Sequence, residues 1–376
     1  MDARIIGLIN VLWFLSFFGL FSVFRRISNG YRRLFGVEQN VALLPGLLPT
    51  IIVFLPFITL IHNAGASVPL PASLGDQAKG SISDCFLYFP VENPSKALLV
   101  EKASQRSYLY RSSNLCRPYR SYPCSTGKNS GPKRERDDKR TPEGIYYVTN
   151  SFKGRELAST YGVRAFPLDY PNLLDQRMGR RGDGIWLHGT NGALVQRDTK
   201  GCVVFRNKDI LDLSRYIHEN QTPVIITEEI NFAAREAVKR EGAELKSLVM
   251  GWLRAWRESR LERYMSFYAK DFVARGRNWH QWRAYKKRLS EKYNTIDIRI
   301  DDLQIFRVNG VVLARFTQTY QADEFFSHGV KRLYLMKQSP EWKITYEFFK
   351  EKREPLVQIT GEDTNPSSRG KTGNTR

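Results

Sequence analysis

The stretch "DGIWLHGTNGALVQRDTKGCVVF", residues 183–205, combines two short apolar segments with a histidine and a cysteine. "GIWLHG" has the pattern of a buried strand that ends at His188, and "GCVVF" starts another strand at Cys202. A loop between antiparallel strands would return Cys202 beside His188. An imidazole that takes the proton of a neighbouring thiol makes it a nucleophile. The stretch therefore predicts either a catalytic Cys–His pair or a polar loop with a buried cysteine.

The glycine before the cysteine bears on the same question. Gly201 has no side chain, so the backbone there can approach a substrate closely. The amides of Gly201 and Cys202 can then donate to the oxyanion of a tetrahedral intermediate. This arrangement suits acyl transfer.

The surrounding residues, 84–230, predict a mainly β domain. "ALLVEK" (97–102) and "RSYLYRS" (106–112) flank a polar turn, which is typical of a hairpin. The loop at 128–144 alternates charges of both signs and is expected to be solvated. One helix is expected near residues 207–220, which carry Ile210, Leu213 and Ile217 at helical spacing.

A second unit begins near residue 243. Apolar side chains fall on one face of a first helix there, and a second helix follows at 279–293. Four runs with period-two alternation come next, so we expect an α+β unit with helices on one face of a curved antiparallel sheet. The face of the first helix consists of Leu245, Leu248, Val249, Trp252, Leu253 and Trp256.

Two apolar runs, residues 5–24 and 41–61, dominate the amino-terminal region. The first is long enough to cross a bilayer as a helix, whereas prolines make the second a poorer helix. The arginines between the runs predict a cytoplasmic loop, so everything after residue 62 is expected outside the cytoplasmic membrane. In the alternative interpretation, the second run belongs to a cleaved signal with small residues at Ala64 and Ala66, and the destination is the same.

The chain carries 58 Lys and Arg against 38 Asp and Glu, a formal charge of +20. The excess favours an anionic partner, and residues 246–350 alone carry 21 basic against 11 acidic side chains. The exported character and the lack of a known nucleic-acid module argue against a nucleic acid. Four cysteines show no metal spacing, and we expect no cofactor or metal. Cys116–Cys124 is the simplest disulfide among Cys85, Cys116 and Cys124, but unpaired cysteines are favoured.

Several short motifs occur together in one order around the opening stretch. They resemble the YkuD-type L,D-transpeptidase catalytic domain over about 96–230, which implies a β-sandwich and a cysteine acylated by peptidoglycan stem peptides. Cys202 is then the nucleophile and His188 the base, with Thr199 or a backbone carbonyl such as that of Gly189 orienting the imidazole. The matching residues are Thr126, Gly127, Lys128, Thr141, Pro142, Gly144, His188, Gly189, Thr199, Gly201 and Cys202.

Three features depart from the family pattern. Lys200 stands where a second histidine is usual, Val204 replaces a polar residue that is often arginine, and the His-to-Cys loop is shorter. Arg206 is a candidate replacement for that arginine. We therefore predict Thr190, Lys200 and Arg206 as substrate-binding residues, while the acceptor of the acyl group stays open.

Residues 243–350 resemble an NTF2-like α+β cone. Its aromatic residues Trp252, Trp256, Tyr264, Tyr268 and Phe272 are expected mostly in the core, with some lining a concave pocket. A YkuD domain followed by an NTF2-like domain is similar to the L,D-carboxypeptidases that set cell shape in helical bacteria. This similarity implies a peptidoglycan-modifying enzyme, either an L,D-transpeptidase or an L,D-carboxypeptidase.

The alternative is a catalytically inactive envelope module whose basic second domain docks on anionic wall polymer or a protein partner. The predicted organisation is an anchoring or signal region at 1–62, a linker at 63–83, the YkuD-like domain at 84–230, a linker at 231–242, the NTF2-like domain at 243–352 and a disordered tail at 353–376. The resulting location is periplasmic or extracytoplasmic, anchored to the inner membrane or exported.

Overall fold

The computed structural model describes residues 80–92 and 95–352. The two apolar runs, most of the predicted linker at 63–83 and the predicted tail at 353–376 lie outside the described residues. No helix within the described ranges has both the length and the apolar character needed to cross a membrane. The amino-terminal anchor or signal therefore stays a prediction.

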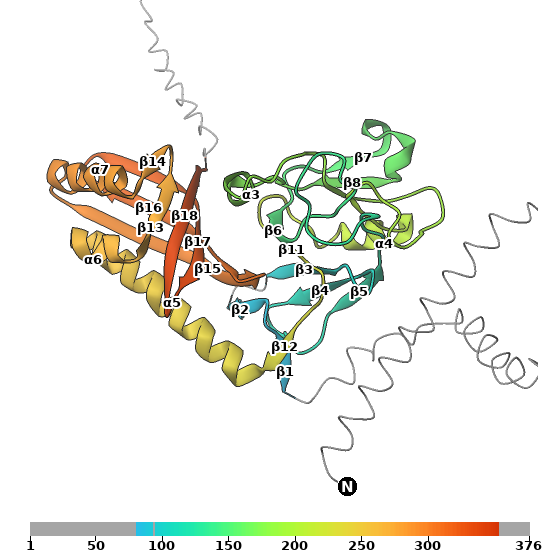
Figure 1. Cartoon of the computed structure of the whole chain (residues 1–376), viewed down its shortest axis with the longest axis horizontal. Coiled ribbons are helices and arrows are strands. Elements are labelled where there is room, and N and C mark those ends of the chain that lie inside the picture. Colours follow the sequence, from blue (N-terminus) through green and yellow to red (C-terminus); the bar gives the residue numbers. More distant parts are fainter. Residues whose placement is uncertain (1–79, 93–94, 353–376) are drawn as a thin grey trace, which may run out of the picture. The chain divides into compact units, whose positions relative to one another are not determined.

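A five-stranded sheet forms the centre of the first domain. In spatial order its strands are β5 (Arg120–Pro123), β4 (Arg106–Arg111), β3 (Lys96–Glu101), β11 (Pro223–Thr227) and β6 (Gly144–Tyr147) (Figure 1). The predicted hairpin is present, because β3 and β4 pair antiparallel with Leu98 opposite Leu109. β11 pairs in parallel with β3, and all of its residues are buried.

A four-stranded sheet carries the opening stretch of the sequence. In spatial order its strands are β10 (Val203–Val204), β9 (Trp186–His188), β8 (Arg164–Pro167) and β7 (Phe152–Lys153). β10 and β9 pair in parallel, with Val203 opposite Leu187, so the expected antiparallel return is wrong. A parallel return needs a long crossover, and the segment from 189 to 202 supplies it.

One apolar core joins these two sheets, which makes the first domain mainly β as expected. Leu98 of β3, Leu187 of β9 and Val203 of β10 are fully buried in it. Helix α4 (Asn207–Leu213) adds Ile210 from the predicted helical segment. The short helical elements of this domain besides α4 are η1 (Gly154–Glu156), η2 (Ser159–Tyr161) and α3 (Leu173–Arg177).

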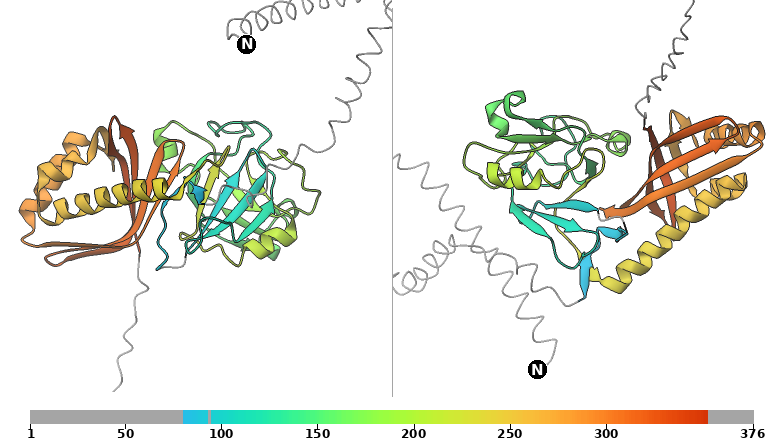
Figure 2. Two further views of the ribbon diagram at one scale, coloured as in Figure 1. Left: turned by 90° about the horizontal axis from the view of Figure 1, so that it is seen from below. Right: turned by 180° about the vertical axis from the view of Figure 1, so that it is seen from behind.

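A seven-stranded sheet and three helices form the second domain, as the period-two runs predicted. In spatial order the strands are β14 (Arg277–Asn278), β13 (Tyr268–Ala274), β18 (Glu341–Glu351), β17 (Phe325–Gln338), β16 (Val311–Ala322), β15 (Ile296–Val308) and β2 (Phe86–Tyr88). The helices are α5 (Arg235–Arg257), α6 (Leu261–Ser266) and α7 (Trp279–Lys292). They gather on one side of the sheet (Figure 2).

The predicted aromatic core of the second domain is confirmed. Trp252 and Trp256 of α5 pack against Tyr264 of α6 with ring centroids 5.9 and 4.9 Å apart. Trp252 also donates a hydrogen bond from Nε1 to the hydroxyl of Tyr268 at 2.8 Å. All five aromatic residues predicted for this core are at most 3 % exposed.

Two predicted boundaries differ from the structure. The expected linker at 231–242 instead contains strand β12 (Phe232–Ala234) and the first turns of α5. β12 pairs antiparallel with β1 (Ser81–Ser83), so the end of the other predicted linker is a strand as well. Gly242 lets α5 pack directly against β2, since a Cβ there would lie 1.8 Å from the Leu87 carbonyl oxygen.

The two domains share a strand and an apolar core. β2 was assigned to the first domain, yet it pairs with β15 of the second. Phe86 on β2 packs with Tyr110 of β4 and with Phe306 of β15, at ring-centroid distances of 4.9 and 6.2 Å. The described residues from 80 to 352 therefore form one packed unit rather than two linked ones.

All four cysteines are free. Cys85 and Cys124 are buried, and burial raises the pKa of the Cys85 thiol to about 12. The simplest disulfide, Cys116–Cys124, is not formed. The cysteines are unpaired in the structure, as the sequence favoured.

Candidate active site

His188 ends strand β9 and is 8 % exposed. Its Nδ1 lies 2.7 Å from the carbonyl oxygen of Gly189. Because a carbonyl can only accept, this contact assigns the proton to Nδ1 and leaves the lone pair on Nε2. The backbone of Gly189, rather than Thr199, therefore orients the imidazole.

Cys202 lies directly before strand β10 and is half-buried. The parallel register sets Val203 opposite Leu187 and Val204 opposite His188, which brings the cysteine level with Trp186 on the neighbouring strand. Its Sγ donates to the carbonyl oxygen of Gly184 at 3.4 Å. No hydrogen bond joins Cys202 to His188 among the described residues, so the thiol rests on the backbone.

Burial shifts both pKa values toward the neutral forms. It lowers the pKa of His188, and the hydrogen bond to Gly189 opposes this only in part. Burial also raises the pKa of Cys202, against smaller opposite effects from the Trp186 backbone and the positive charge of Lys133. The resting site therefore has a neutral thiol and, on the neighbouring strand, a neutral imidazole that can act as a base.

A hydrogen-bonded turn presents the cysteine. The Thr199 hydroxyl donates to the Cys202 carbonyl oxygen at 2.8 Å and accepts from the Gly201 amide at 3.0 Å. The buried Thr141 hydroxyl donates to the Gly201 carbonyl oxygen at 2.9 Å. Gly201 itself has φ +133°, and a Cβ there would lie 2.8 Å from the Arg140 carbonyl oxygen. The turn therefore requires glycine at this position.

The two predicted oxyanion donors, the amides of Gly201 and Cys202, differ in whether they are already hydrogen-bonded. The Gly201 amide already donates to Thr199, so it is not available to a substrate. The Cys202 amide has no hydrogen-bond partner within the described part of the chain. Of the two predicted donors, only the Cys202 amide is therefore free to donate to an oxyanion.

Aromatic rings form a wall beside the histidine, which the sequence analysis did not identify. Tyr161 stacks on Trp186 at 4.7 Å and meets the ring of His188 edge-on at 5.0 Å. Phe152 stacks on the indole of Trp186 at 5.6 Å. Trp186 could have been found, because residues two apart on a strand share a face.

Asn207 clamps the backbone that holds His188. Its Oδ1 accepts from the Val163 amide at 3.2 Å, and its Nδ2 donates to Asn191 at 2.8 Å. A Cβ on Gly189 would lie 2.3 Å from the same Oδ1, and one on Gly162 would lie 2.2 Å from it. Both glycines therefore let the amide sit directly against the loop that carries the orienting carbonyl.

The predicted substrate-binding residues are Thr190, Lys200 and Arg206, and the contacts of two of them are local. The Thr190 hydroxyl accepts from the Gly192 amide at 3.1 Å, and Lys200 is exposed. Arg206 donates from Nε to Asp209 at 2.6 Å across the start of α4. This ion pair is the contact that Arg206 makes in the structure, and its role as a replacement for an arginine at position 204 stays a prediction.

Most charged side chains of the loop at 128–144 are exposed, as expected, whereas Lys133 and Glu143 are buried. Lys133 is 2 % exposed and pairs with Asp138 at 2.7 Å. Thr141 and the Arg140 backbone pack against Gly201 in the turn that carries the cysteine. Alternating charges in a sequence do not distinguish solvated charges from charges paired within one loop, which explains why the burial of Lys133 was not expected.

A cavity with a volume of about 510 Å³ lies in the second domain. Lys331 pairs there with Glu347 at 2.5 Å, and Lys286 lies 4.0 Å from the ring centroid of Trp256. Burial lowers the pKa of Lys286 to about 7, although Glu347 acts in the opposite direction. Its lining includes Arg275, Trp282, Tyr285, Lys286, Tyr320, Phe325, Lys331 and Glu347.

Within residues 80–92 and 95–352, no group of three or more His, Cys, Asp or Glu side chains is arranged to hold a metal ion. A thiol, an oriented imidazole and a free amide are the groups that acyl transfer by a cysteine needs, and the structure holds them on a mainly β domain.

Comparisons with known proteins agree with this class. The L,D-transpeptidase catalytic domain (YkuD) matches residues 95–226, and the Cds6 C-terminal NTF2-like domain matches residues 244–348. The structure of Bd1075 from Bdellovibrio bacteriovorus is similar over 73% of this chain and 100% of that chain, with 30% identity and a TM-score of 0.64. The chain belongs to the L,D-transpeptidase (YkuD) family, in the form that carries a C-terminal NTF2-like domain.

A second solved structure supports the fold. The helical cell shape determining protein Pgp2 from Campylobacter jejuni has 24% identity and a TM-score of 0.57 over 74% of this chain and 97% of that chain. A comparison with curated protein sequences found no significant match.

Proposed function

We propose that the protein cleaves peptidoglycan stem peptides through an acyl-enzyme on Cys202. The observation that carries the proposal is the Gly189 carbonyl on Nδ1 of His188, which leaves Nε2 as a base one strand away from the cysteine. Membership of the L,D-transpeptidase family supports the substrate class.

The first step follows from the resting protonation states. The thiol leaves the Gly184 carbonyl and gives its proton to Nε2 of His188 as sulfur attacks the carbonyl between an L-centre and a D-residue. The Cys202 amide donates to the developing oxyanion. The intermediate collapses to a thioester when His188 returns the proton to the leaving amine, which departs as the D-residue.

The second step resolves the thioester. His188 takes a proton from the acceptor, which attacks the thioester carbonyl, and the thiol is restored when that proton passes to sulfur. If the acceptor is water, a tetrapeptide becomes a tripeptide, which is the L,D-carboxypeptidase reaction. If it is an amine, a new crosslink or an exchanged terminal residue forms, which is the L,D-transpeptidase reaction.

One experiment tests the reaction and identifies the acceptor. The full chain, purified in detergent, is incubated with tetrapeptide and pentapeptide muropeptides and compared with Cys202→Ala. Tripeptide products indicate hydrolysis, and crosslinked or exchanged products indicate transfer. The absence of any Cys202-dependent product on every stem would overturn the enzyme proposal in favour of an inactive envelope module.

The cavity of about 510 Å³ in the NTF2-like domain favours an additional function, the binding of anionic wall polymer. Three basic side chains line it (Arg275, Lys286 and Lys331) against two acidic ones (Glu347 and Glu351), which leaves a basic excess. Glu347 pairs with Lys331. The test is co-sedimentation of the full chain with purified peptidoglycan sacculi. Lys331→Ala is expected to reduce the bound fraction severalfold, and equal binding by the exposed control variant Lys287→Ala and by Lys331→Ala would contradict this function.

The proposed substrate requires an extracytoplasmic position. The apolar runs at 5–24 and 41–61 and the arginines between them support export or anchoring to the inner membrane. An alkaline phosphatase fused after residue 66 is expected to be active in cells. An inactive fusion, with an active cytoplasmic reporter at the same site, would reject this location.

A further inference from the structure

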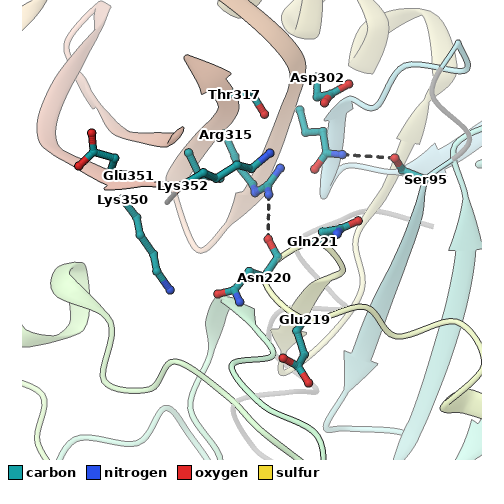
Figure 3. A pocket seen from close by; sticks show the side chains of 12 residues that line it. Ser95, Glu219, Asn220, Gln221, Asp302, Arg315, Thr317, Lys350, Glu351 and Lys352 are labelled. Atoms are coloured by element: carbon teal, nitrogen blue, oxygen red, sulfur yellow. Dashed lines mark hydrogen bonds between the residues drawn. The ribbon is translucent and has the colours of Figure 1, made fainter. Parts of the chain in front are cut away.

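A polar pocket of about 570 Å³ lies on the face of the second domain's sheet opposite the aromatic core. Its floor is formed by the buried side chains of Gln304 on β15 and of Arg315 and Thr317 on β16. Figure 3 shows Arg315 between these strands and the loop that carries Asn220. The outer lining consists of Ser95, Glu219, Asn220, Gln221, Asp302, Val330, Lys350, Glu351 and Lys352.

Arg315 is a buried cation without a carboxylate partner among the described residues. It is 7 % exposed and donates from Nη2 to the Asn220 carbonyl oxygen at 2.8 Å. Its Nε is buried without any partner. A guanidinium has five N–H donors and does not deprotonate in proteins, so one neutral acceptor satisfies little of this group.

The neighbouring strand increases this excess of positive charge. Arg332 is directly opposite Arg315 in the β16–β17 register, and both guanidinium groups lie over the ring of Tyr147, at 4.3 and 5.2 Å respectively. Asp169 pairs with Arg332 at 2.6 Å. Like charges opposite each other on a sheet are destabilising, and one carboxylate cannot neutralise both. An anion at Arg315 would supply the missing charge.

The rim of the pocket selects among anions. Exposed carboxylates of Glu219, Asp302 and Glu351 line it together with Lys350 and Lys352. Acidic groups at the rim repel a compact polyanion but attract an ammonium group. A ligand that carries both a carboxylate and an ammonium fits a pocket with a cationic floor and a partly acidic rim.

We propose that this pocket binds an α-amino acid group, with its carboxylate on the Arg315 guanidinium and its ammonium toward the acidic rim. Arginine and carboxylate can pair through two parallel hydrogen bonds, which fixes the orientation of the ligand. The group can come from a free amino acid or from a short peptide. The pocket is separate from the Cys202 site, so the proposal does not depend on catalysis.

Calorimetric titration of the full chain in detergent tests the pocket, with alanine, the dipeptide Ala-Ala, alanine amide, N-acetylalanine and inorganic phosphate as probes. Alanine or the dipeptide is expected to bind, and the stronger of the two identifies the source of the group. Alanine amide and N-acetylalanine are each expected to bind at least about tenfold more weakly, because each lacks one charge. Phosphate binding as strong as that of alanine would overturn the proposal.

Two variants place the binding at this pocket. Arg315→Met is expected to weaken the binding of the stronger probe at least about tenfold. Val330→Phe fills the pocket without a change of charge and is expected to do the same in a folded protein, which covers the case that Arg315→Met fails to fold. Lys287→Met, at an exposed position on α7 outside this pocket, is expected to bind like wild type. Absence of binding by alanine and Ala-Ala to wild type, or unchanged binding by Val330→Phe, would reject the pocket.

Discussion

At the scale of single residues, the protonation state of His188 decides when the proposed reaction can begin. The Gly189 carbonyl fixes the tautomer, and burial lowers the pKa of the imidazole below its ordinary value of 6.5. A base must be unprotonated to accept the thiol proton. The reactive form of the site therefore persists to lower pH than an exposed histidine would allow.

The pH profile of kcat/KM on a stem tetrapeptide checks this point. Activity is expected to fall as the pH drops through the pKa of His188, with the midpoint of the acidic limb below 6.5. Burial raises the pKa of Cys202, so the thiol is neutral near pH 7 and does not form a resting thiolate–imidazolium pair with His188. No further change of activity from such a pair is expected near neutrality. An acidic limb centred at or above 6.5 would contradict a neutral, buried base.

Gly189→Ala tests the clamp on the orienting carbonyl. The new Cβ would lie 2.3 Å from Oδ1 of Asn207, so the loop must shift and carry the Gly189 carbonyl away from His188. A displacement of this kind is expected to reduce kcat about 100-fold. Gly192→Ala is the matched control, because the nearest atom to its Cβ is 3.7 Å away. Equal activities of the two variants would contradict the clamp, whereas partial recovery in Gly189→Ala/Asn207→Ala would support it.

At the level of helices and strands, the spacing of apolar residues predicted the elements that form from their own local sequence. The β3–β4 hairpin, helix α4, the aromatic face of α5 and the alternating strands of the second domain are present because each depends on its own spacing of apolar residues. The motif around Cys202 and His188 likewise predicted which residues lie on neighbouring strands.

The elements that were missed depend on partners distant in sequence. The parallel pairing of β9 and β10, the capture of β2 by β15 and the burial of Lys133 each need a contact that no short window contains. The roles of Asn207 and Arg315 depend on such contacts as well. Asn207 binds the Val163 amide, and Arg315 binds the Asn220 carbonyl oxygen.

Helix α7 carries a lysine whose burial makes stability depend on pH. The folded pKa of Lys286 is about 7, against an ordinary 10.5, so between these values the unfolded state binds a proton that the folded state lacks. Stability therefore rises with pH across this window, and below it the folded state bears the full cost of the buried charge.

Lys286→Met is expected to raise the melting temperature at pH 6, by about 2–4 °C for each kcal/mol regained, and the gain should shrink as the pH approaches 10. Lys287→Met, at an exposed neighbouring position on the same helix, is expected to change the melting temperature little at either pH. A gain from Lys286→Met that is independent of pH would show that the ammonium is not desolvated.

At the scale of the whole molecule, the shared core predicts that the two domains unfold together. Phe306 of the second domain is fully buried, and its ring centroid lies 5.4 Å from that of Phe89, which precedes the first-domain sheet. Phe306→Ala removes a contact that belongs to both domains, and a buried Phe→Ala change costs about 3–5 kcal/mol.

Scanning calorimetry of the full chain distinguishes cooperative from independent unfolding. Wild type is expected to show one transition for the described part of the chain, and Phe306→Ala is expected to move that single transition to lower temperature. Phe326→Ala, at a position that is 56% exposed on β17, serves as the control and should leave it nearly unchanged. If Phe306→Ala instead splits the transition, so that one part keeps the wild-type melting temperature, the domains are stable separately. The shared strand β2 and its core would then connect them without making them one cooperative unit.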